Sequence, residues 1–471
     1  MHKLWSLLCR NVIYTYNKKN IQTFYSAAYN ASPYRDLFSE RKEPFGKMPK
    51  EGIQNIWENL PPATMESYLN TSWSCKKSEQ TENKLDLATE NILDEEGNPL
   101  VFQSVLKARE KISSQDIFST DSCVLGDQEF LDDALKLAYG SEMYQRDHIA
   151  AIETVGGTGA LRIAFEFISR CFISLDGQKP RVYVPNLCWP NYKEIIKSTG
   201  LKMRDYRSYR KNIQGIDLKS CLSDLFRATK GSVALLEASG QNPTGTDFSP
   251  EQWKEISQIL KDRKYLCVVD MAYQGLVHGD LDRDALALRR LVEDGHQVIV
   301  CQSLSKSFSL QGNPIGTLSV LTSSKEEKEK VWTHIRSLSH SMLSSVPNYG
   351  RLIVKTILSN EALKKEWMEE TQNLVKRMKA TRQALHDQLV SLNKSNGVDW
   401  SFLLQQQGMF LFTGLEAEQV DKLQKEYNIY LQPDGRLNLG ALTASQVERV
   451  GTAIHKMTLT NSTNSEQVST E

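Results

Sequence analysis

The sequence predicts an α/β protein, with a large domain built on a mainly parallel sheet wrapped by helices and a smaller α+β domain. Short apolar runs rich in β-branched residues alternate with helical stretches through the middle of the chain. Such runs are typical of strands that are buried on both faces, as they are in parallel sheets. The 471 residues, of which 40% are hydrophobic, suffice for a large core.

Five apolar runs are the expected strands, and each is followed by a turn and a helical stretch. They are residues 149–155, 181–184, 233–239, 265–270 and 298–303. After the first run, Leu161, Ala164, Phe165 and Ile168 recur at the spacing of one helical face. This spacing predicts a helix that packs against the sheet.

The pattern changes after about residue 361. There we expect two long polar helices and then two short strands near Phe410 and Leu437, which is typical of a smaller α+β domain. The polar segment from Thr458 is expected to be disordered. The expected boundaries are 32–98 for an N-terminal arm and part of the small domain, 99–370 for the large domain, 371–457 for the small C-terminal domain and 458–471 for the tail.

Residues 1–31 contain no acidic residue and mix apolar side chains with Lys3, Arg10, Lys18 and Lys19. This composition is typical of a mitochondrial transit peptide, so we expect a mitochondrial matrix protein. A secretory signal fits less well because the basic residues interrupt the apolar stretch. A disordered basic arm is the remaining alternative.

The charge balance and the Cys and His spacing exclude several classes of partner. Lys plus Arg and Asp plus Glu both number 57, so we expect neither nucleic acid nor a membrane surface as partner. No apolar run approaches the roughly 20 residues that span a bilayer. The eight cysteines and eight histidines show no metal-ligand spacing, so we expect reduced thiols and no metal site.

Ligands of open α/β sheets bind beyond the carboxyl ends of the strands, so the residues after each apolar run are the candidates for a site. The first run is followed by Gly156-Gly157-Thr158-Gly159 at the start of a helix, where backbone N–H groups could bind an anion. A simple tight turn is the alternative. The full phosphate-binding loop ending in Gly-Lys-Ser/Thr is absent, which argues against a nucleotide triphosphatase.

The next three strand ends each offer a ligand contact and a structural alternative. Trp189 could stack on a planar ring or pack in the core, and Asn242 could donate to a ligand oxygen or simply form its Asn-Pro-Thr-Gly turn. Asp270, with Tyr273 three residues later, could pair with a buried cationic ring or cap a helix.

Lys306, in the segment Ser303-Leu304-Ser305-Lys306, decides among these alternatives. A lysine directly after a buried strand is badly placed for a solvated charge. We expect its amine to be desolvated, partly deprotonated and nucleophilic toward a carbonyl. Together with an anion-binding helix start, a stacking Trp and an acid that can keep a pyridine nitrogen protonated, this lysine fits pyridoxal phosphate.

Several segments resemble the aspartate aminotransferase family of pyridoxal-phosphate aminotransferases. They are ETVGGTGALRIAF, SGQNPTGTDFSPEQWKEI, DMAYQGLVHGDLDRDA, CQSLSKSFSL and GMFLFTGL. The resemblance runs from about Trp57 to Met457 with the segments in family order. It implies pyridoxal 5'-phosphate as cofactor, an amino acid (aspartate or glutamate favoured) and a 2-oxo acid as substrates, and a homodimer with shared active sites.

The resemblance also implies a role for each candidate. Lys306 matches the lysine of the internal aldimine, Asp270 the partner of the pyridine nitrogen, and Trp189 the ring that stacks on the cofactor. Asn242 and Tyr273 match the groups that hydrogen-bond the cofactor's phenolic oxygen. The phosphate-binding segments contain Gly157, Thr158, Ser303 and Ser305.

The implied substrate-binding residues are Arg436, Trp189, Asn242, Phe410 and His340. Arg436 matches the arginine that binds the α-carboxylate, and Phe410 lies where the family lines the site. His340 stands where the family has an arginine for the distal carboxylate, donated by the neighbouring subunit, and it lacks the guanidinium fork. Arg336, one helical turn earlier, could serve instead.

Three further departures lie close to the implied cofactor. Pro314 replaces an arginine that binds the phosphate, and Asp121 aligns with a tyrosine that reaches the phosphate from the neighbouring subunit. Glu90 lies near the position of a glycine in the loop that folds over substrate. A charge-assisted hydrogen bond contributes about 1.5 to 3 kcal/mol, so the loss of the phosphate contacts is expected to weaken cofactor binding. These changes bear on affinity more than on the reaction step.

Two functions from different classes therefore remain open. The first is an active aminotransferase in which Lys306 moves the proton between the donor and the cofactor. The second is a weak or inactive paralogue that keeps the fold for a structural or binding role. Ser303-x-x-Lys306 also matches the motif of acyl-enzyme forming penicillin-binding proteins, but the companion Ser-Asp-Asn and Lys-Thr-Gly motifs are missing.

Overall fold

The computed structural model describes residues 59–61, 67–78, 83–113, 126–310, 312–393 and 398–466. The chain divides into two compact units, Met1–Thr64 and Met65–Glu471, and the description concerns the second. The segment expected to be a transit peptide and Asp121 lie outside the described residues.

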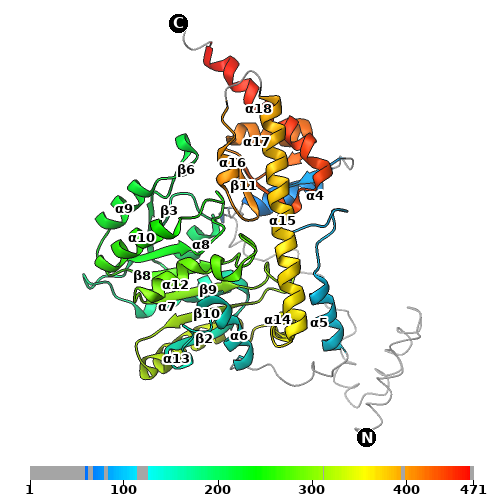
Figure 1. The fold of residues 1–471 in the computed structure, drawn as a ribbon. Helices are drawn as coiled ribbons and strands as arrows, with labels where there is room; N and C mark the ends of the chain where they lie inside the picture. The colour runs from blue at the N-terminus through cyan, green and yellow to red at the C-terminus, as the bar shows by residue number, and fades with distance from the viewer. Residues whose placement is uncertain are drawn as a thin grey trace, which may run out of the picture. The chain divides into compact units, whose positions relative to one another are not determined.

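A seven-stranded sheet forms the centre of the large domain, with the strand order β2-β10-β9-β8-β7-β3-β4 (Figure 1). Its strands are β2 (Ile149–Thr154), β3 (Arg181–Pro185), β4 (Lys202–Tyr206), β7 (Val233–Glu237), β8 (Leu266–Met271), β9 (Val298–Ser303) and β10 (Gly316–Leu321). The five expected strands and the mainly parallel sheet are confirmed. Strands β4 and β10 were not expected, and β10 runs antiparallel to both β2 and β9.

Alternate residues of the strands join two different apolar clusters, one on each face of the sheet. In β8, Val268 belongs to a cluster with α7 (Gly156–Cys171) and α13 (Lys325–Leu343), whereas Val269 belongs to the cluster on the other face. The expected apolar face of α7 is buried in the first cluster. Burial on both faces explains why these strands read as continuous apolar runs.

Further helices belong to the large domain and to the segments before it. They are α4 (Ser67–Lys77), α5 (Gln103–Ser113), α6 (Gln128–Tyr139), α8 (Asn191–Ser198), α9 (Leu218–Arg227), α10 (Pro250–Asp262), α11 (Leu281–Asp284), α12 (Leu286–Glu293) and α14 (Asn348–Leu358), with the 3₁₀ turns η2 (Arg146–His148) and η3 (Lys211–Ile213). A small antiparallel pair, β5 (Tyr209–Arg210) and β6 (Gly215–Ile216), lies beyond β4 in the chain.

Two short sheets form the small domain. Strand β1 (Leu85–Asp86) pairs in parallel with β12 (Ile429–Tyr430), and β11 (Phe410–Phe412) pairs antiparallel with β13 (Arg436–Asn438). The remaining elements are α15 (Glu361–Leu392), α16 (Phe402–Gln405), α17 (Ala417–Tyr427), η4 (Leu439–Ala441), η5 (Ala444–Gln446) and α18 (Val447–Glu466). The two short strands near Phe410 and Leu437 are confirmed.

Two expectations about helices were wrong. The segment after residue 361 forms one helix of 32 residues, α15, rather than two, because buried residues from Leu363 to Leu389 continue along it and it contains neither Gly nor Pro. Figure 1 shows α15 running from α5 and α14 to α16 and α18. Helix α18 continues to Glu466, into the segment expected to be disordered, where again no Gly or Pro ends it.

Two features are absent from the described residues. No helix there has the length and apolar character needed to cross a bilayer. Within the same residues, no group of three His, Cys, Asp or Glu side chains is placed to hold a metal ion.

Candidate active site

A cavity of about 200 Å³ lies at the carboxyl ends of β2, β8 and β9 and contains most of the expected site residues. Those that line it are Gly157, Thr158, Trp189, Asn242, Asp270, Tyr273, Ser303, Ser305 and Lys306. Glu90, Tyr192, Glu237 and Pro314 line it as well. A larger groove of about 800 Å³, between α6, α11 and α15, contains none of the expected site residues.

The turn at the start of α7 and the segment after β9 meet at one end of this cavity. A Cβ added to Gly157 would lie 3.1 Å from Cβ of Ser303, so the close approach requires glycine. Ser305 Oγ accepts a hydrogen bond from the backbone N–H of Ile315 (3.0 Å) and donates one to its carbonyl oxygen (3.2 Å). Pro314 also lines this end, so the arginine that the family places there has no cationic replacement at that position.

Asp270, the residue before the last of β8, is buried. One of its carboxylate oxygens has a hydrogen-bond donor and the other does not. Oδ2 accepts a hydrogen bond from the hydroxyl of Tyr192 at 2.5 Å, whereas Oδ1 has no hydrogen-bond partner among the described residues. Burial raises the pKa of Asp270 to about 6, against the smaller opposing effects of Tyr192 and Lys306. A buried carboxylate oxygen without a donor fits a ligand that brings a protonated ring nitrogen.

Tyr273 and Asn242 connect Lys306 to the small domain. Lys306 Nζ donates to the hydroxyl of Tyr273 at 3.2 Å, and Asn242 Nδ2 lies 3.4 Å from the same hydroxyl. Arg436 on β13 donates from Nη1 to Asn242 Oδ1 at 2.5 Å. A continuous set of polar contacts therefore runs from Lys306 to Arg436.

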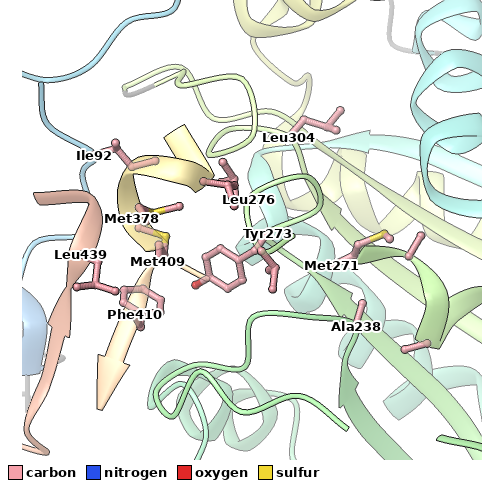
Figure 2. Close-up of a cluster of buried hydrophobic side chains, with 14 of the residues drawn as sticks. Ile92, Ala238, Met271, Tyr273, Leu276, Leu304, Met378, Met409, Phe410 and Leu439 are labelled. Atoms are coloured by element: carbon pink, nitrogen blue, oxygen red, sulfur yellow. The ribbon is translucent and has the colours of Figure 1, made fainter. Parts of the chain in front are cut away.

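Aromatic rings fix these polar groups from the side. The rings of Tyr273 and Phe410 meet edge to face with centroids 5.7 Å apart, and the guanidinium of Arg436 lies 4.4 Å from the centroid of Phe410. Figure 2 shows Tyr273 beside Phe410 and Met409 in a buried apolar cluster. Trp189 packs edge to face on Tyr192 at 5.5 Å, which places both beside Asp270.

Lys306 is paired with an acid that the sequence did not identify as its partner. Its Nζ lies 3.0 Å from Oε2 of Glu90. Burial disfavours the charge on Lys306, but Glu90 and Tyr273 outweigh burial, so the pKa of Lys306 is raised. The pKa is therefore shifted in the opposite direction from that of the expected, partly deprotonated amine, because Glu90 stabilises the ammonium.

His340 and Arg336, the two residues expected to bind the distal carboxylate, lie on α13 and outside the cavity lining. His340 is exposed near the end of α13, with Nδ1 2.9 Å from the carbonyl oxygen of Ser344. The guanidinium of Arg336 lies 5.0 Å from the centroid of the Trp332 ring. Neither residue lines the cavity of its own chain, so their role in a partner's site stays a prediction.

Sequence reasoning missed Tyr192 and Glu237. Tyr192 follows Trp189 by three residues, and Glu237 lies two residues before the end of the expected strand 233–239 and is the last residue of β7. Both therefore lie close to a strand end, where a site residue could have been sought. Burial, with a smaller effect of Asp270, raises the pKa of Glu237 well above its usual range. Glu237 also accepts from the backbone N–H of Asn242 at 2.8 Å and so helps to position that residue.

The cavity brings a lysine, an acid with an unpaired oxygen, a tyrosine and an asparagine together beyond the carboxyl ends of parallel strands. This set of residues fits an enzyme that uses pyridoxal phosphate. The family described as aminotransferase class I and II matches residues 82–454. The chain belongs to this family, in its aspartate aminotransferase branch.

Individual relatives cover nearly the same part of the chain. It is 36% identical over 411 residues to mitochondrial aspartate aminotransferase of Dictyostelium discoideum, covering 86% of this chain and 94% of the relative. It is 33% identical over 408 residues to the mitochondrial enzyme of Arabidopsis thaliana, covering 86% and 93%.

Solved structures agree with this assignment. Aspartate aminotransferase from the cytoplasm of Saccharomyces cerevisiae superposes with a TM-score of 0.81 at 29% identity, covering 86% of this chain and 98% of that one. An aromatic-amino-acid aminotransferase from Burkholderia pseudomallei, covalently bound to pyridoxal phosphate, superposes with a TM-score of 0.79 at 26% identity, covering 86% and 100%.

Proposed function

We propose that this aminotransferase moves an amino group between an amino acid and a 2-oxo acid, with pyridoxal 5'-phosphate held by Lys306. The observation that carries the proposal is the continuous contact from Lys306 through Tyr273 and Asn242 to Arg436, beside the unpaired oxygen of Asp270. Nothing in the described residues favours the alternative of an inactive paralogue.

Each residue has a definable task in this reaction. The N-terminus of α7 and the adjacent Ser303 and Ser305 would bind the phosphate. Asp270 would hold a proton on the ring nitrogen, and Tyr273 and Asn242 would hydrogen-bond the ring oxygen. Pyridoxal phosphate, when bound, supplies an electron sink for the charge that develops at the donor's Cα.

The substrate-side tasks belong to three groups. Arg436 would bind the donor's α-carboxylate through its planar fork and is already held by Asn242. Lys306, freed by the incoming amine, would carry the proton away from Cα. Glu90, 3.0 Å from Lys306 Nζ, would stabilise the ammonium that Lys306 forms when it takes up that proton.

We also propose a mitochondrial location, a homodimer and the domain boundaries given by the sequence. The named relatives of Dictyostelium and Arabidopsis are mitochondrial enzymes, and the acid-free composition of residues 1–31 supports a transit peptide. The pairing of β1 with β12 supports a small domain that includes part of residues 32–98.

The test is to capture the cofactor on its lysine. Purified protein is incubated with pyridoxal phosphate, reduced with borohydride and analysed by peptide mass spectrometry, while absorbance follows cofactor binding. We expect the label on the peptide that contains Lys306, none in Lys306→Ala, and wild-type labelling in Lys193→Ala, whose lysine is exposed near the site. A wild-type protein without label on Lys306 would overturn the proposal.

A further inference from the structure

Two acids lie side by side at the carboxyl ends of β7 and β8. Glu237 and Asp270 are partners in the parallel register of these strands, and both line the cavity. Asp270 Oδ1 has no hydrogen-bond partner in the described part of the chain. Glu237 uses both oxygens, because Oε2 accepts from the backbone N–H of Asn242 at 2.8 Å and Oε1 accepts from Gln241 Nε2 at 3.2 Å. Glu237 therefore binds the turn that carries Asn242, whereas Asp270 is left for a ligand.

Through Gln241, Glu237 also connects the two turns on which Asn242 and Trp189 lie. Gln241 Nε2 donates to the carbonyl oxygen of Leu187 at 2.8 Å, two residues before Trp189, and to that of Asn242 at 2.9 Å. Trp189 would stack on the ring of the cofactor, and Asn242 would hydrogen-bond its oxygen. The contacts of Glu237 and Gln241 therefore fix the spacing of two groups that would hold the same ring.

The described contacts of Glu237 favour a neutral carboxyl group. Its two hydrogen-bond donors are uncharged amides, and Lys306, which lines the same cavity, is paired with Glu90. The ionisable groups that interact electrostatically with Glu237 include two acids, two phenols and a thiol, namely Asp270, Asp247, Tyr192, Tyr206 and Cys188. Burial, and to a smaller extent Asp270, raises the pKa of Glu237 well above its usual range, whereas the pKa of Asp270 is about 6. At neutral pH Asp270 is therefore the charged member of the pair.

We propose that Glu237 is a positioning residue that works in its neutral form: it holds Asn242 in place for the cofactor and leaves Asp270 as the single negative charge of the pair. A charged Glu237 would be an ion without a cationic partner beside a second carboxylate, which is an unfavourable arrangement. The positioning role rests on the proposed function, whereas the protonation state of Glu237 is a property of the protein alone.

Infrared difference spectroscopy on the cofactor-free protein tests the protonation state. The spectrum of wild type minus that of Glu237→Gln isolates this carboxyl group. Subtraction of Glu255→Gln, at an exposed position on α10, gives the signal of an ordinary ionised carboxylate as a control. Near neutral pH we expect the carbonyl stretch of a protonated acid in the first difference and carboxylate bands alone in the second. Carboxylate bands alone in both would overturn the inference.

Absorbance titration of the cofactor-loaded protein tests the positioning role. A donor to the ring oxygen favours its ionised form, so a displaced Asn242 should move the midpoint to higher pH. We expect a shift of roughly 0.4 to 1 pH unit in Glu237→Leu, in which the N–H of Asn242 loses its acceptor. Glu237→Gln should keep the wild-type midpoint, because its amide oxygen can accept from Asn242 and Gln241 Nε2 keeps two other acceptors.

A shifted midpoint in Glu237→Gln would overturn the inference, and so would an unshifted midpoint in Glu237→Leu. If Glu237→Leu does not fold, the infrared difference and the midpoint of Glu237→Gln still decide. Failure of the proposed function is recognised separately, because wild type then binds no cofactor while the infrared difference still shows whether Glu237 is neutral.

Discussion

At the scale of single residues, the cavity contains two acids, Asp270 and Glu237, whose pKa values are raised by burial. Asp270 and Glu237 are paired in the register of β8 and β7, and both lie at the carboxyl ends of their strands. Asp270 keeps one oxygen free while Tyr192 binds the other. Burial of an unpaired carboxylate oxygen is unfavourable. In the proposed function, a protonated ring nitrogen would offset this cost by donating a hydrogen bond to that oxygen.

Asp270 should make the cofactor-free protein less stable as pH rises. Its pKa is raised from 3.8 to about 6, so the folded state binds this proton more tightly than the unfolded state does. The stabilising contribution is full below about pH 4 and is lost as pH rises through 6. Asp270→Asn should therefore gain about 3 kcal/mol relative to wild type between pH 4 and pH 7. Urea unfolding at both pH values measures this, and a pH-independent difference would contradict it.

Much of the site could be read from the sequence because strand ends share one edge of a sheet. Lys306, Asp270, Asn242 and Trp189 each follow an apolar run, and the structure brings all of them to one cavity. The contact of Glu90 with Lys306 could not be predicted from the positions of the strand ends. The two residues are 216 positions apart, and no local pattern shows that the segment after β1 meets the segment after β9.

At the scale of elements, α15 anchors the segment that carries the reactive lysine. Trp367 stacks on Phe308 with ring centroids 4.2 Å apart and an interplanar angle of 6°, and its Nε1 donates to the carbonyl oxygen of Ser307 at 2.8 Å. The two residues after Lys306 are thus fixed by one side chain of a helix from a later part of the chain. The sequence showed helical character there but neither the length of α15 nor this contact.

Two substitutions of Trp367 should separate the contribution of its stacking on Phe308 from that of its hydrogen bond to Ser307. Trp367→Phe keeps an aromatic ring but loses the hydrogen bond, so we expect the free energy of unfolding to fall by about 0.5 to 1.5 kcal/mol. Trp367→Ala also leaves a cavity and should lower it by about 3 to 5 kcal/mol. Denaturant titration measures both, with Trp73→Phe as the control because Trp73 is 51% exposed. Equal losses in the two Trp367 variants would show that stacking contributes nothing.

At the scale of the whole molecule, the described residues that line the cavity include no cation other than Lys306. His340 and Arg336 lie on α13 and do not line the cavity of their own chain. The family resemblance assigns the contact with a distal carboxylate to the neighbouring subunit. In the proposed homodimer, the second copy of the chain would supply this contact with substrate.

Light scattering after gel filtration should give about twice the mass of one chain, which is 53.5 kDa with its N-terminal segment. Dilution into the low micromolar range should leave this mass unchanged if the sites are shared between subunits. A protein that elutes as a monomer and still transfers amino groups at the wild-type rate would exclude a shared site.

The position of β10 has a consequence for the order of folding. Strand β2 is paired in the described sheet with β10 alone, and Gly316 at the start of β10 is paired with both Thr154 and Ser303. A Cβ at Gly316 would meet Gln302 O and the backbone of Gly156, so the turn that begins α7 and the end of β9 are packed against one glycine. A growing chain therefore cannot close this edge of its sheet until Gly316–Leu321 has been synthesised. The end of the cavity that Gly157 and Ser303 line is completed only at that stage.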